Sequence, residues 1–337
     1  MTGWVDLIAR ARGLETHLLG LHELGAMVRA PDLAALGEAL RRHGFPVDEG
    51  APAPAALELA IRRRAAREMR VLVRWCGPRT DLLRVIFEDE ERRSLRALLR
   101  GAVEGASEEA RVSGLVPTPA LPERALSELA RQKTPAAVAT TLTAWGNPYG
   151  TPLREKAAGL HPDLLGLEMV VNRTYVERAL AGAQRAGGSE LAGYVRELID
   201  LENVGTAVAL VAAKDLVPKT LFLHGGARVS IDRFERAIAS RDGPAAAASL
   251  APAFGATRLA RVLADAARGT GTLDERLLHA RLAALRRQAR HHPLGLAPVL
   301  EYALHLRAES VDLSRTVWGL ALGAPAPALL DALISAV

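Results

Sequence analysis

Cysteine is the scarcest residue type in this 337-residue chain, which contains Cys76 alone. A single cysteine excludes an internal disulfide and any metal site built from several thiolates. We expect Cys76 to be a reduced, cytosolic residue that packs as a small hydrophobic side chain. A catalytic thiol is not favoured, because Cys76 follows Trp75 at a predicted helix end and has no obvious histidine partner in the sequence.

Aromatic residues are also rare, at 4%, although hydrophobic residues make up 49% of the chain. The abundance of alanine, leucine and arginine favours helices, because these side chains lose little rotamer freedom there. The β-branched and aromatic residues that favour strands are few. No run alternates between apolar and polar residues, and no strand–helix–strand rhythm is visible. The composition therefore predicts an all-α fold.

The sequence has no uninterrupted apolar run of membrane-spanning length. Its most apolar stretch, residues 317–337, contains Asp331 and is interrupted by Gly323 and Pro325. We predict a buried helix, a loop and a terminal helix there. The N-terminus has no basic segment followed by an apolar run, so we expect no secretory signal.

The charges are balanced, with 43 basic and 38 acidic residues, a net charge of +5 and a pI near 9.8. This balance permits an acidic partner or a position near a membrane and requires neither. The basic runs Arg62–Arg64 and Arg286–Arg290 lack the interleaved aromatic residues typical of nucleic-acid binding. We interpret both as solvated faces of amphipathic helices, with an acidic protein surface, a lipid headgroup or a phosphate backbone as alternative ligands.

Motifs of several enzyme classes are missing. The chain has no His-Glu-x-x-His or paired Glu-x-x-His for a metal, no Gly-x-x-x-x-Gly-Lys-Ser/Thr for phosphate and no Gly-x-Ser-x-Gly for a nucleophilic serine. Glu275 and His279 are interpreted as a helix-surface pair, and His291-His292 as a complement to a helix C-terminus. We therefore predict no catalytic, cofactor-binding or metal-binding residues and no direct binding of nucleotide or nucleic acid.

Helical periodicity is clear in several segments. Apolar residues recur at helical spacing over Leu7–Met27, Ala55–Trp75 and Asp81 to about Val103. A further helix is predicted over Asp32–Arg42. Gly77-Pro78 is expected to separate the two long helices that flank it.

A short block of residues occurs in three evenly spaced copies. Each copy has an acid followed, three positions later, by a small polar residue or a second acid. The pairs are Glu91 and Ser94, Asp200 and Asn203, and Glu309 and Asp312. The step from the first copy to the second equals the step from the second to the third, and it also separates Pro135 from Pro244. We call this constant separation the repeat interval. Three repeat intervals cover nearly the whole chain, which indicates that one helical unit occurs three times.

Two interpretations of this recurring pair are open. It could be a polar site present in three copies, or it could be structural, as a hydrogen bond from helix to helix or as a solvated face. The structural interpretation is favoured, because the second member changes from Ser94 to Asn203 to Asp312. A chemical site would tolerate such changes poorly.

Connectors rich in proline and glycine predict the boundaries of the repeats. They span residues 107–122 and 216–230. The predicted domains are residues 1–113, 114–222 and 223–337. The segments around Pro117–Pro119 and Gly225-Gly226 are candidate contact points, since loops carry binding more often than helix interiors do.

Several segments resemble a known family. They are Ile8–Leu14 (IARARGL), Ile199–Val204 (IDLENV), Leu221–Gly226 (LFLHGG) and His292–Tyr302 (HPLGLAPVLEY), followed by Glu309, Leu313, Arg315 and Gly323–Pro325 (GAP). Together they are similar to the C subunit of the V/A-type rotary ATPases, the homologue of the eukaryotic d subunit. The resemblance spans the whole chain. It departs from the family at Asp312, where asparagine is usual, and at Ser314, where arginine is frequent.

The resemblance implies an all-helical funnel of three similar domains around a pseudo-threefold axis. It implies a non-catalytic rotor subunit of the central stalk, peripheral to the cytoplasmic face of the membrane and without a cofactor. Its partners would be shaft subunits D and F of the soluble head and the c-ring, or proteolipid ring, which carries protons or sodium ions.

Two alternatives to this function remain open. One is a helical-repeat adaptor unrelated to rotary ATPases, although the repeat interval is long for solenoids, whose units run about 20–45 residues. The other is an all-helical enzyme with a pocket between the thirds, which would need convergent polar groups.

Overall fold

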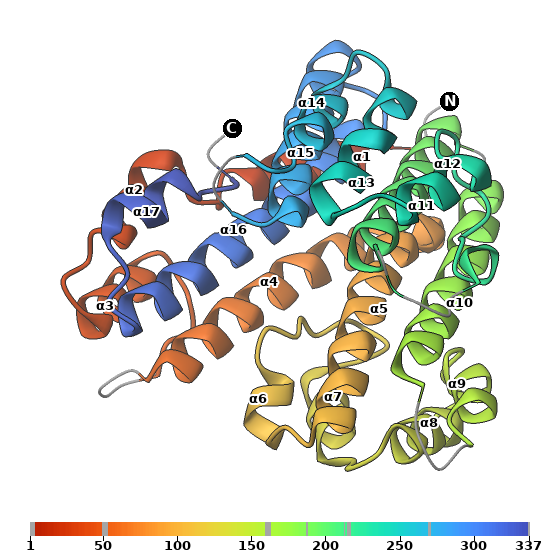
Figure 1. The fold of residues 1–337 in the computed structure, drawn as a ribbon. Helices are drawn as coiled ribbons and strands as arrows, with labels where there is room; N and C mark the ends of the chain where they lie inside the picture. The colour runs from red at the N-terminus through yellow and green to blue at the C-terminus, as the bar shows by residue number, and fades with distance from the viewer. Residues whose placement is uncertain are drawn as a thin grey trace. The chain divides into compact units, whose positions relative to one another are not determined.

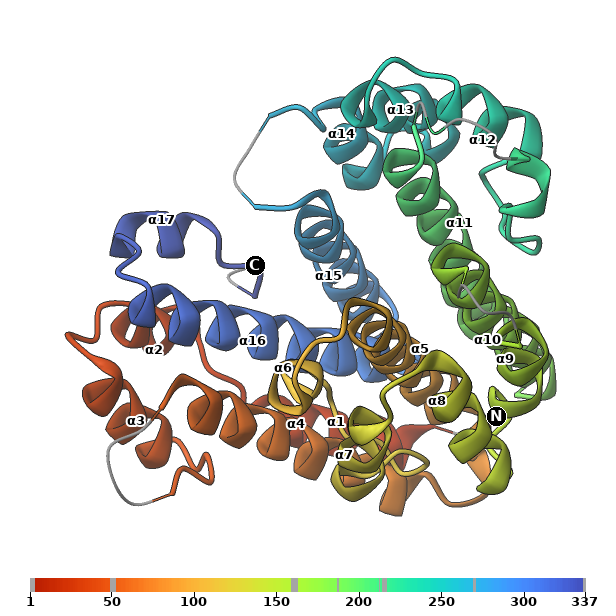
Figure 2. The ribbon, with the colours of Figure 1, turned by 60° about the horizontal axis from the view of Figure 1, so that its bottom comes forward.

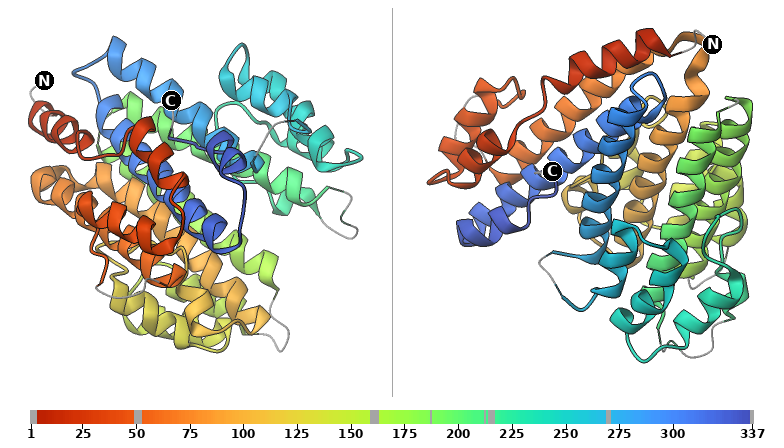
Figure 3. Two further views of the ribbon diagram at one scale, coloured as in Figure 1. Left: turned by 90° about the vertical axis from the view of Figure 1, so that its left-hand side faces the viewer. Right: turned by 90° about the horizontal axis from the view of Figure 1, so that it is seen from above.

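The structure is a computed structural model, which describes residues 4–48, 53–158, 163–186, 188–211, 213, 217–268 and 271–335. Every regular element in these ranges is a helix (Figures 1 and 3). There are seventeen α-helices and three short 3₁₀ helices, and no strand occurs in the described ranges. The prediction of an all-α fold is confirmed.

The chain divides into two compact units. We call Leu40–Gly187 the inserted unit, because it lies within the sequence of the other. The terminal unit combines Met1–Ala39 with Gly188–Val337. The predicted division into thirds, and their arrangement around an axis, stay predictions.

Two long helices organise the inserted unit. Its helices are α4 (Pro54–Cys76), η1 (Gly77–Arg79), α5 (Thr80–Glu104), α6 (Glu108–Val112), α7 (Glu123–Arg131), α8 (Pro135–Ala144), α9 (Gly150–Lys156) and α10 (Leu164–Arg185). Helices α5 and α10 lie side by side over much of their length (Figure 1). The apolar face of α5, with Leu95, Leu98 and Leu99, is fully buried. Helices α8 and α9 pack together, and α9 packs on α10 (Figure 2).

The terminal unit is built on α11, α15 and α16. Its helices are α1 (Val5–Glu15), α2 (Leu21–Val28), α11 (Ser189–Ala209), η2 (Pro218–Thr220), α12 (Ile231–Ile238), α13 (Gly243–Leu250), η3 (Ala251–Phe254), α14 (Arg258–Ala264), α15 (Leu273–His291), α16 (Ala297–Ala321) and α17 (Ala326–Asp331). Helix α16 packs against α15 and α1, and α11 packs against α12 and α13. Leu282, Leu304 and Ile334 lie in one apolar cluster of this unit. Helix α3 (Leu33–Arg42) crosses the boundary between the two units.

Most of the predicted helices are confirmed. Helices α3, α4 and α5 match their predicted ranges closely, and Gly77 separates α4 from α5 with a φ of +55°. The prediction of a single helix over Leu7–Met27 is wrong. Helix α1 ends at Glu15 and α2 begins at Leu21, because the backbone N–H of Leu19 donates to a side chain of α16 instead of continuing the helix.

The C-terminal apolar stretch has the predicted helix–loop–helix order in its described part. Helix α16 ends at Ala321, Gly323 follows with a φ of +72°, and α17 begins at Ala326. Within the described residues, none of the helices combines the length and the apolar character needed to span a bilayer. Cys76 is buried as predicted, and its Sγ lies 3.0 Å from the carbonyl oxygen of Arg79.

The repeat interval is visible in the order of the helices. The helices α7 to α11 are followed by α12 to α16, and each later helix begins almost one repeat interval after its counterpart. Pro135 and Pro244 both lie in the first turn of their helices. Both helices are capped alike, by Thr134 and Asp242, whose side chains accept from the backbone N–H three residues on. The repeat therefore extends to helix starts and caps.

Candidate functional site

The recurring polar pairs are buried in every copy. Asp200, Asn203 and Asp312 have no exposed surface, and Glu91, Ser94 and Glu309 are at most 3% exposed. We refer to these as the α5 pair (Glu91, Ser94), the α11 pair (Asp200, Asn203) and the α16 pair (Glu309, Asp312). The interpretation as a solvated face is wrong. The side chains of these pairs hydrogen-bond non-helical segments, so the interpretation as a bond from helix to helix is wrong as well.

The α11 pair binds the backbone of the segment 223–229. The carboxylate of Asp200 accepts hydrogen bonds from the backbone N–H groups of Ala227, Arg228 and Val229, each at 3.0 Å. Three N–H donors compensate for the burial of this charge. The side-chain amide of Asn203 donates to the carbonyl of Leu223 at 2.9 Å and accepts from its N–H at 2.8 Å.

The turn at Gly225-Gly226 makes this close approach possible. Gly225 has a φ of +106°, which strongly favours glycine. A Cβ on Gly226 would lie 2.2 Å from Oδ1 of Asp200, which is closer than the two atoms can approach. The Gly-Gly turn therefore brings the backbone close to the buried carboxylate.

The α5 pair contacts its connector in a related way. Oε1 of Glu91 accepts a hydrogen bond of 2.7 Å from the Oγ1 hydroxyl of Thr118. The same hydroxyl oxygen accepts from the N–H of Leu121, so Thr118 closes the turn at 118–121. Glu91 and Thr118 are 27 residues apart, and so are Asp200 and Ala227. Burial raises the pKa of Glu91 to about 7, and the nearby charge of Glu88 adds to the shift.

The α16 pair binds the segment that follows α1 and the segment that follows α17. The carboxylate of Glu309 accepts from the backbone N–H of Leu19 at 2.7 Å. Asp312 accepts from the backbone N–H groups of Ile334 and Ser335, both at 2.8 Å, and from the Ser335 hydroxyl. Burial raises the pKa of Asp312 although these hydrogen bonds oppose the shift. In all three copies, a long helix fixes a non-helical segment through a buried polar side chain.

The other polar candidates of the sequence have structural partners. Glu275 does not pair with His279: it belongs to the capping box of α15 with Thr272 and also pairs with Arg315. Nδ1 of His279 lies 3.0 Å from the carbonyl of Ile334. His291 ends α15, as its interpretation as a C-terminal complement predicts. The described residues contain no group of three or more side chains able to hold a metal.

The interpretation of the basic runs as solvated faces is wrong for several of their members. Arg62 is 9% exposed and donates to the carbonyl oxygens of Val112 and Leu115. Arg64 is 2% exposed and lies over the ring of Phe45. Arg286 is half-buried and pairs with Glu301. These arginines bind segments of the chain itself, and sequence periodicity alone does not show such partners.

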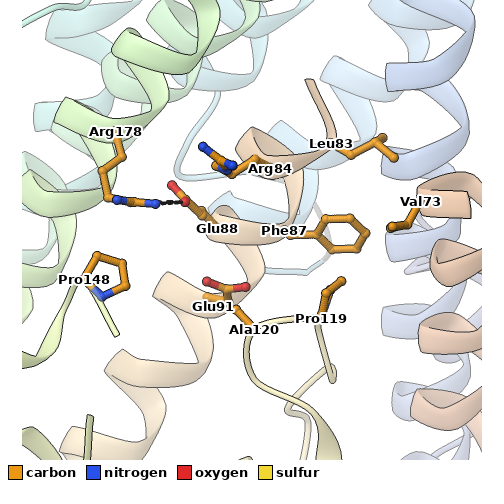
Figure 4. Close-up of a pocket in the computed structure, with 10 residues that line it drawn as sticks. All are labelled: Val73, Leu83, Arg84, Phe87, Glu88, Glu91, Pro119, Ala120, Pro148 and Arg178. Atoms are coloured by element: carbon orange, nitrogen blue, oxygen red, sulfur yellow. Dashed lines mark hydrogen bonds and ion pairs between the residues drawn. The ribbon is translucent and has the colours of Figure 1, made fainter. Parts of the chain in front are cut away.

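A cavity of about 380 Å³ lies within the inserted unit (Figure 4). Charged groups from two helices converge on it: Arg84, Glu88 and Glu91 from α5, and Arg178 from α10. Glu88 accepts two hydrogen bonds from the guanidinium of Arg178, the one from Nε at 3.1 Å. The sequence motifs did not reveal this cluster, because Arg178 lies far from Glu88 in the sequence. The one available signal was the spacing of Arg84, Glu88 and Glu91 on one helix face.

The arrangement of the polar pairs favours a scaffold over a catalyst. The six side chains are withdrawn from solvent, and those of Glu91, Asp200, Asn203, Glu309 and Asp312 bind backbone groups or a hydroxyl. A curated set of protein sequences contains no match to the chain. The family model described as ATP synthase (C/AC39) subunit matches residues 7–326, which is nearly the whole chain and includes all three polar pairs. The chain therefore belongs to the ATP synthase (C/AC39) subunit family, and it is a subunit of a V/A-type ATPase.

Proposed function

We propose that this chain is the rotor subunit of the central stalk, which joins shaft subunits D and F to the c-ring of the membrane sector. The observation that carries the proposal is the family match over residues 7–326. It agrees with the resemblance of Ile199–Val204 and His292–Tyr302 to the C subunit of rotary ATPases. In this role the chain transmits torque between the shaft and the ion-carrying ring, and it needs neither a catalytic residue nor a cofactor.

The buried polar pairs support a mechanical role. Each of α5, α11 and α16 binds a non-helical segment through hydrogen bonds that are shielded from water. Close-packed interiors deform little, so segments held in this way keep their positions under load. The segments near Pro117–Pro119 and Gly225-Gly226 are our candidate contact points with the neighbouring proteins of the complex.

We further propose that the chain binds peripherally at the cytoplasmic face of the membrane, through the c-ring. The described residues include no helix suited to crossing a membrane, which agrees with attachment through a partner. A mixture of basic and acidic residues suits a reversible interface better than a continuous apolar surface does.

The threefold organisation of residues 1–113, 114–222 and 223–337 is part of the same proposal. It is supported by the helix starts that recur after nearly one repeat interval and by the equal sequence separations within the α5 and α11 contacts. The alternative of an adaptor unrelated to rotary ATPases is not supported, because the family match covers the three copies together.

Reconstitution of the complete complex in vesicles tests the role. Without this chain, we expect the soluble head to hydrolyse ATP while ATP-driven ion uptake is lost, and we expect added chain to restore uptake. Pull-down with tagged chain should retain both the D–F shaft and the c-ring. Full ion uptake without the chain, or retention of neither neighbour, would contradict the proposal, and so would ATP hydrolysis by the pure chain.

A further inference from the structure

The cavity of the inserted unit has an apolar part and a charged part. Its apolar lining includes Phe87, Val73 and Pro119, and its charged lining consists of Arg84, Glu88, Glu91 and Arg178. Figure 4 shows the two carboxyl groups close together, between Arg178 and Pro148 on one side and Phe87 on the other. A volume of about 380 Å³ lies within the range of small-ligand pockets, roughly 300–1,000 Å³.

The carboxyl groups of Glu88 and Glu91 offer more hydrogen-bond acceptor positions than donors of the protein occupy. One oxygen of Glu88 binds Arg178, whereas Oε2 is buried and has no hydrogen-bond partner among the residues that the structure describes. Glu88 itself is only 5% exposed, so bulk water does not supply that partner freely. Leaving a buried acceptor without a partner is energetically unfavourable. The cavity therefore favours a ligand that donates hydrogen bonds here.

Glu91 adds to this excess of acceptors, and a buried tyrosine hydroxyl also has no partner among the described residues. Glu91 uses Oε1 for Thr118, and its second oxygen makes no hydrogen bond within the described part of the chain. The hydroxyl of Tyr149 is fully buried and has no partner among the described residues. Burial raises the pKa of Tyr149, and the charges of Glu88 and Glu91 raise it further, so this hydroxyl keeps its proton.

The chemistry of these groups selects the ligand. The two cations of the lining, Arg84 and Arg178, already have partners within the chain, so an anion would meet the carboxyl groups without a free cation to bind. A purely apolar ligand would leave Oε2 of Glu88 unpaired. An ammonium group offers three donors and no acceptor, and an aliphatic stem can lie against Phe87 and Val73. We propose that this cavity binds an alkylammonium group, with the ammonium between Glu88 and Glu91 and the stem on the apolar lining. The group belongs either to a lysine of a neighbouring polypeptide or to a small free amine.

The direct test titrates the purified full-length chain with n-butylammonium chloride, with n-butanol as the neutral probe of the same length, and follows binding by calorimetry. We expect saturable binding of the amine and none of the alcohol. Binding should strengthen from about pH 5.5 to about pH 8, because ionised Glu91 is the form that attracts the cation.

Three variants locate the site. Glu91→Gln keeps an oxygen for Thr118 and removes the charge, and we expect it to weaken binding about tenfold at the higher pH. Ala120→Leu, at an exposed position on the rim, should also weaken binding by narrowing the cavity. Glu104→Gln, an exposed site on the same helix, is the matched control and should bind as the unmodified chain does. Each variant's helical content and unfolding midpoint show whether it remains folded.

The source of the amine is distinguished in the assembled complex. A carbodiimide joins a carboxylate to an adjacent lysine amine, so a cross-linked peptide that contains Glu88 or Glu91 would identify a partner's lysine. Butylammonium binding at full strength in the complex, without such a cross-link, would identify a free amine. Absence of saturable binding to the pure chain, equal binding of n-butanol, or unchanged binding in Glu91→Gln would overturn the proposal. None of these results depends on the rotary role.

Discussion

The carboxylate of Glu309 accepts a hydrogen bond from the backbone N–H of Leu19, a residue 290 positions earlier in the chain. The bond is 2.7 Å long and buried, and it occurs where the apolar pattern of the N-terminus predicted an unbroken helix. A charged acceptor makes a stronger hydrogen bond than a carbonyl does, which explains why the chain leaves the helix between Glu15 and Leu21.

The hydrogen bond between Glu309 and Leu19 predicts a local effect on amide hydrogen exchange. In Glu309→Ala, the Leu19 amide loses its acceptor, so we expect its hydrogen exchange to become at least about tenfold faster. The measurement is hydrogen exchange of the full chain, resolved at Leu19 by NMR. Ser310→Ala is the matched control, because the Ser310 hydroxyl donates to Leu306 within α16. Unchanged protection of Leu19 in Glu309→Ala would show that the contact is not formed in solution.

The Asp200 contact predicts a loss of stability. In the unmodified chain, both carboxylate oxygens of Asp200 accept hydrogen bonds from backbone N–H groups. Asp200→Asn replaces one of these oxygens by an amide NH₂ group, so that a donor faces a donor. We expect a decrease of about 2–3 kcal/mol in the free energy of unfolding, measured by urea titration. Asp232→Asn, at an exposed position of α12, should change stability by no more than about 0.5 kcal/mol. Equal effects of the two substitutions would contradict the assigned role of Asp200.

Glu91 predicts a pH dependence with a definite sign. Its pKa is about 7 in the folded chain and near 4.5 when unfolded, so the folded state holds the proton more tightly between these values. Stability should therefore fall as pH rises from about 4.5 to 7, by up to about 3 kcal/mol from this group. Glu91→Gln should be more stable than the unmodified chain at pH 8, and the difference should vanish below pH 4.5. A difference that does not vary with pH would refute this assignment.

Two glycines predict opposite effects of one substitution. A Cβ on Gly150 would lie 2.4 Å from the backbone nitrogen of Thr143, so Gly150→Ala must force α8 and α9 apart. We expect a loss of about 2–3 kcal/mol in the free energy of unfolding. A Cβ on the exposed Gly193, within α11, meets nothing within 4 Å. Gly193→Ala should therefore stabilise the chain by about 0.5–1 kcal/mol, and both changes can be read from thermal or urea unfolding.

The fold class and the long helices could be predicted because they depend on local patterns. The apolar stripes of α4 and α5 and the break at Gly77 are encoded within a few residues of one another. The repeat interval also needed only the sequence, and it drew attention to residues that prove to be buried.

The partners of those residues could not be predicted, because they depend on distant segments. Asp200 and Glu91 have partners 27 residues away, and Glu309 has one 290 residues away. The burial of Arg62 depends likewise on the carbonyl of Val112, far along the chain. A charged side chain on a helix has the same local pattern whether it faces water or a carbonyl oxygen.

The division into an inserted unit and a terminal unit has a consequence for biosynthesis. Every residue of the inserted unit has left the ribosome soon after Gly187 is made, so this unit can fold while translation continues. The segment Met1–Ala39 is synthesised before the inserted unit but must wait for α16, which follows that unit and supplies Glu309. This segment thus reaches its contact with Glu309 only after the whole inserted unit has been made, and we expect it to be exposed to aggregation until then.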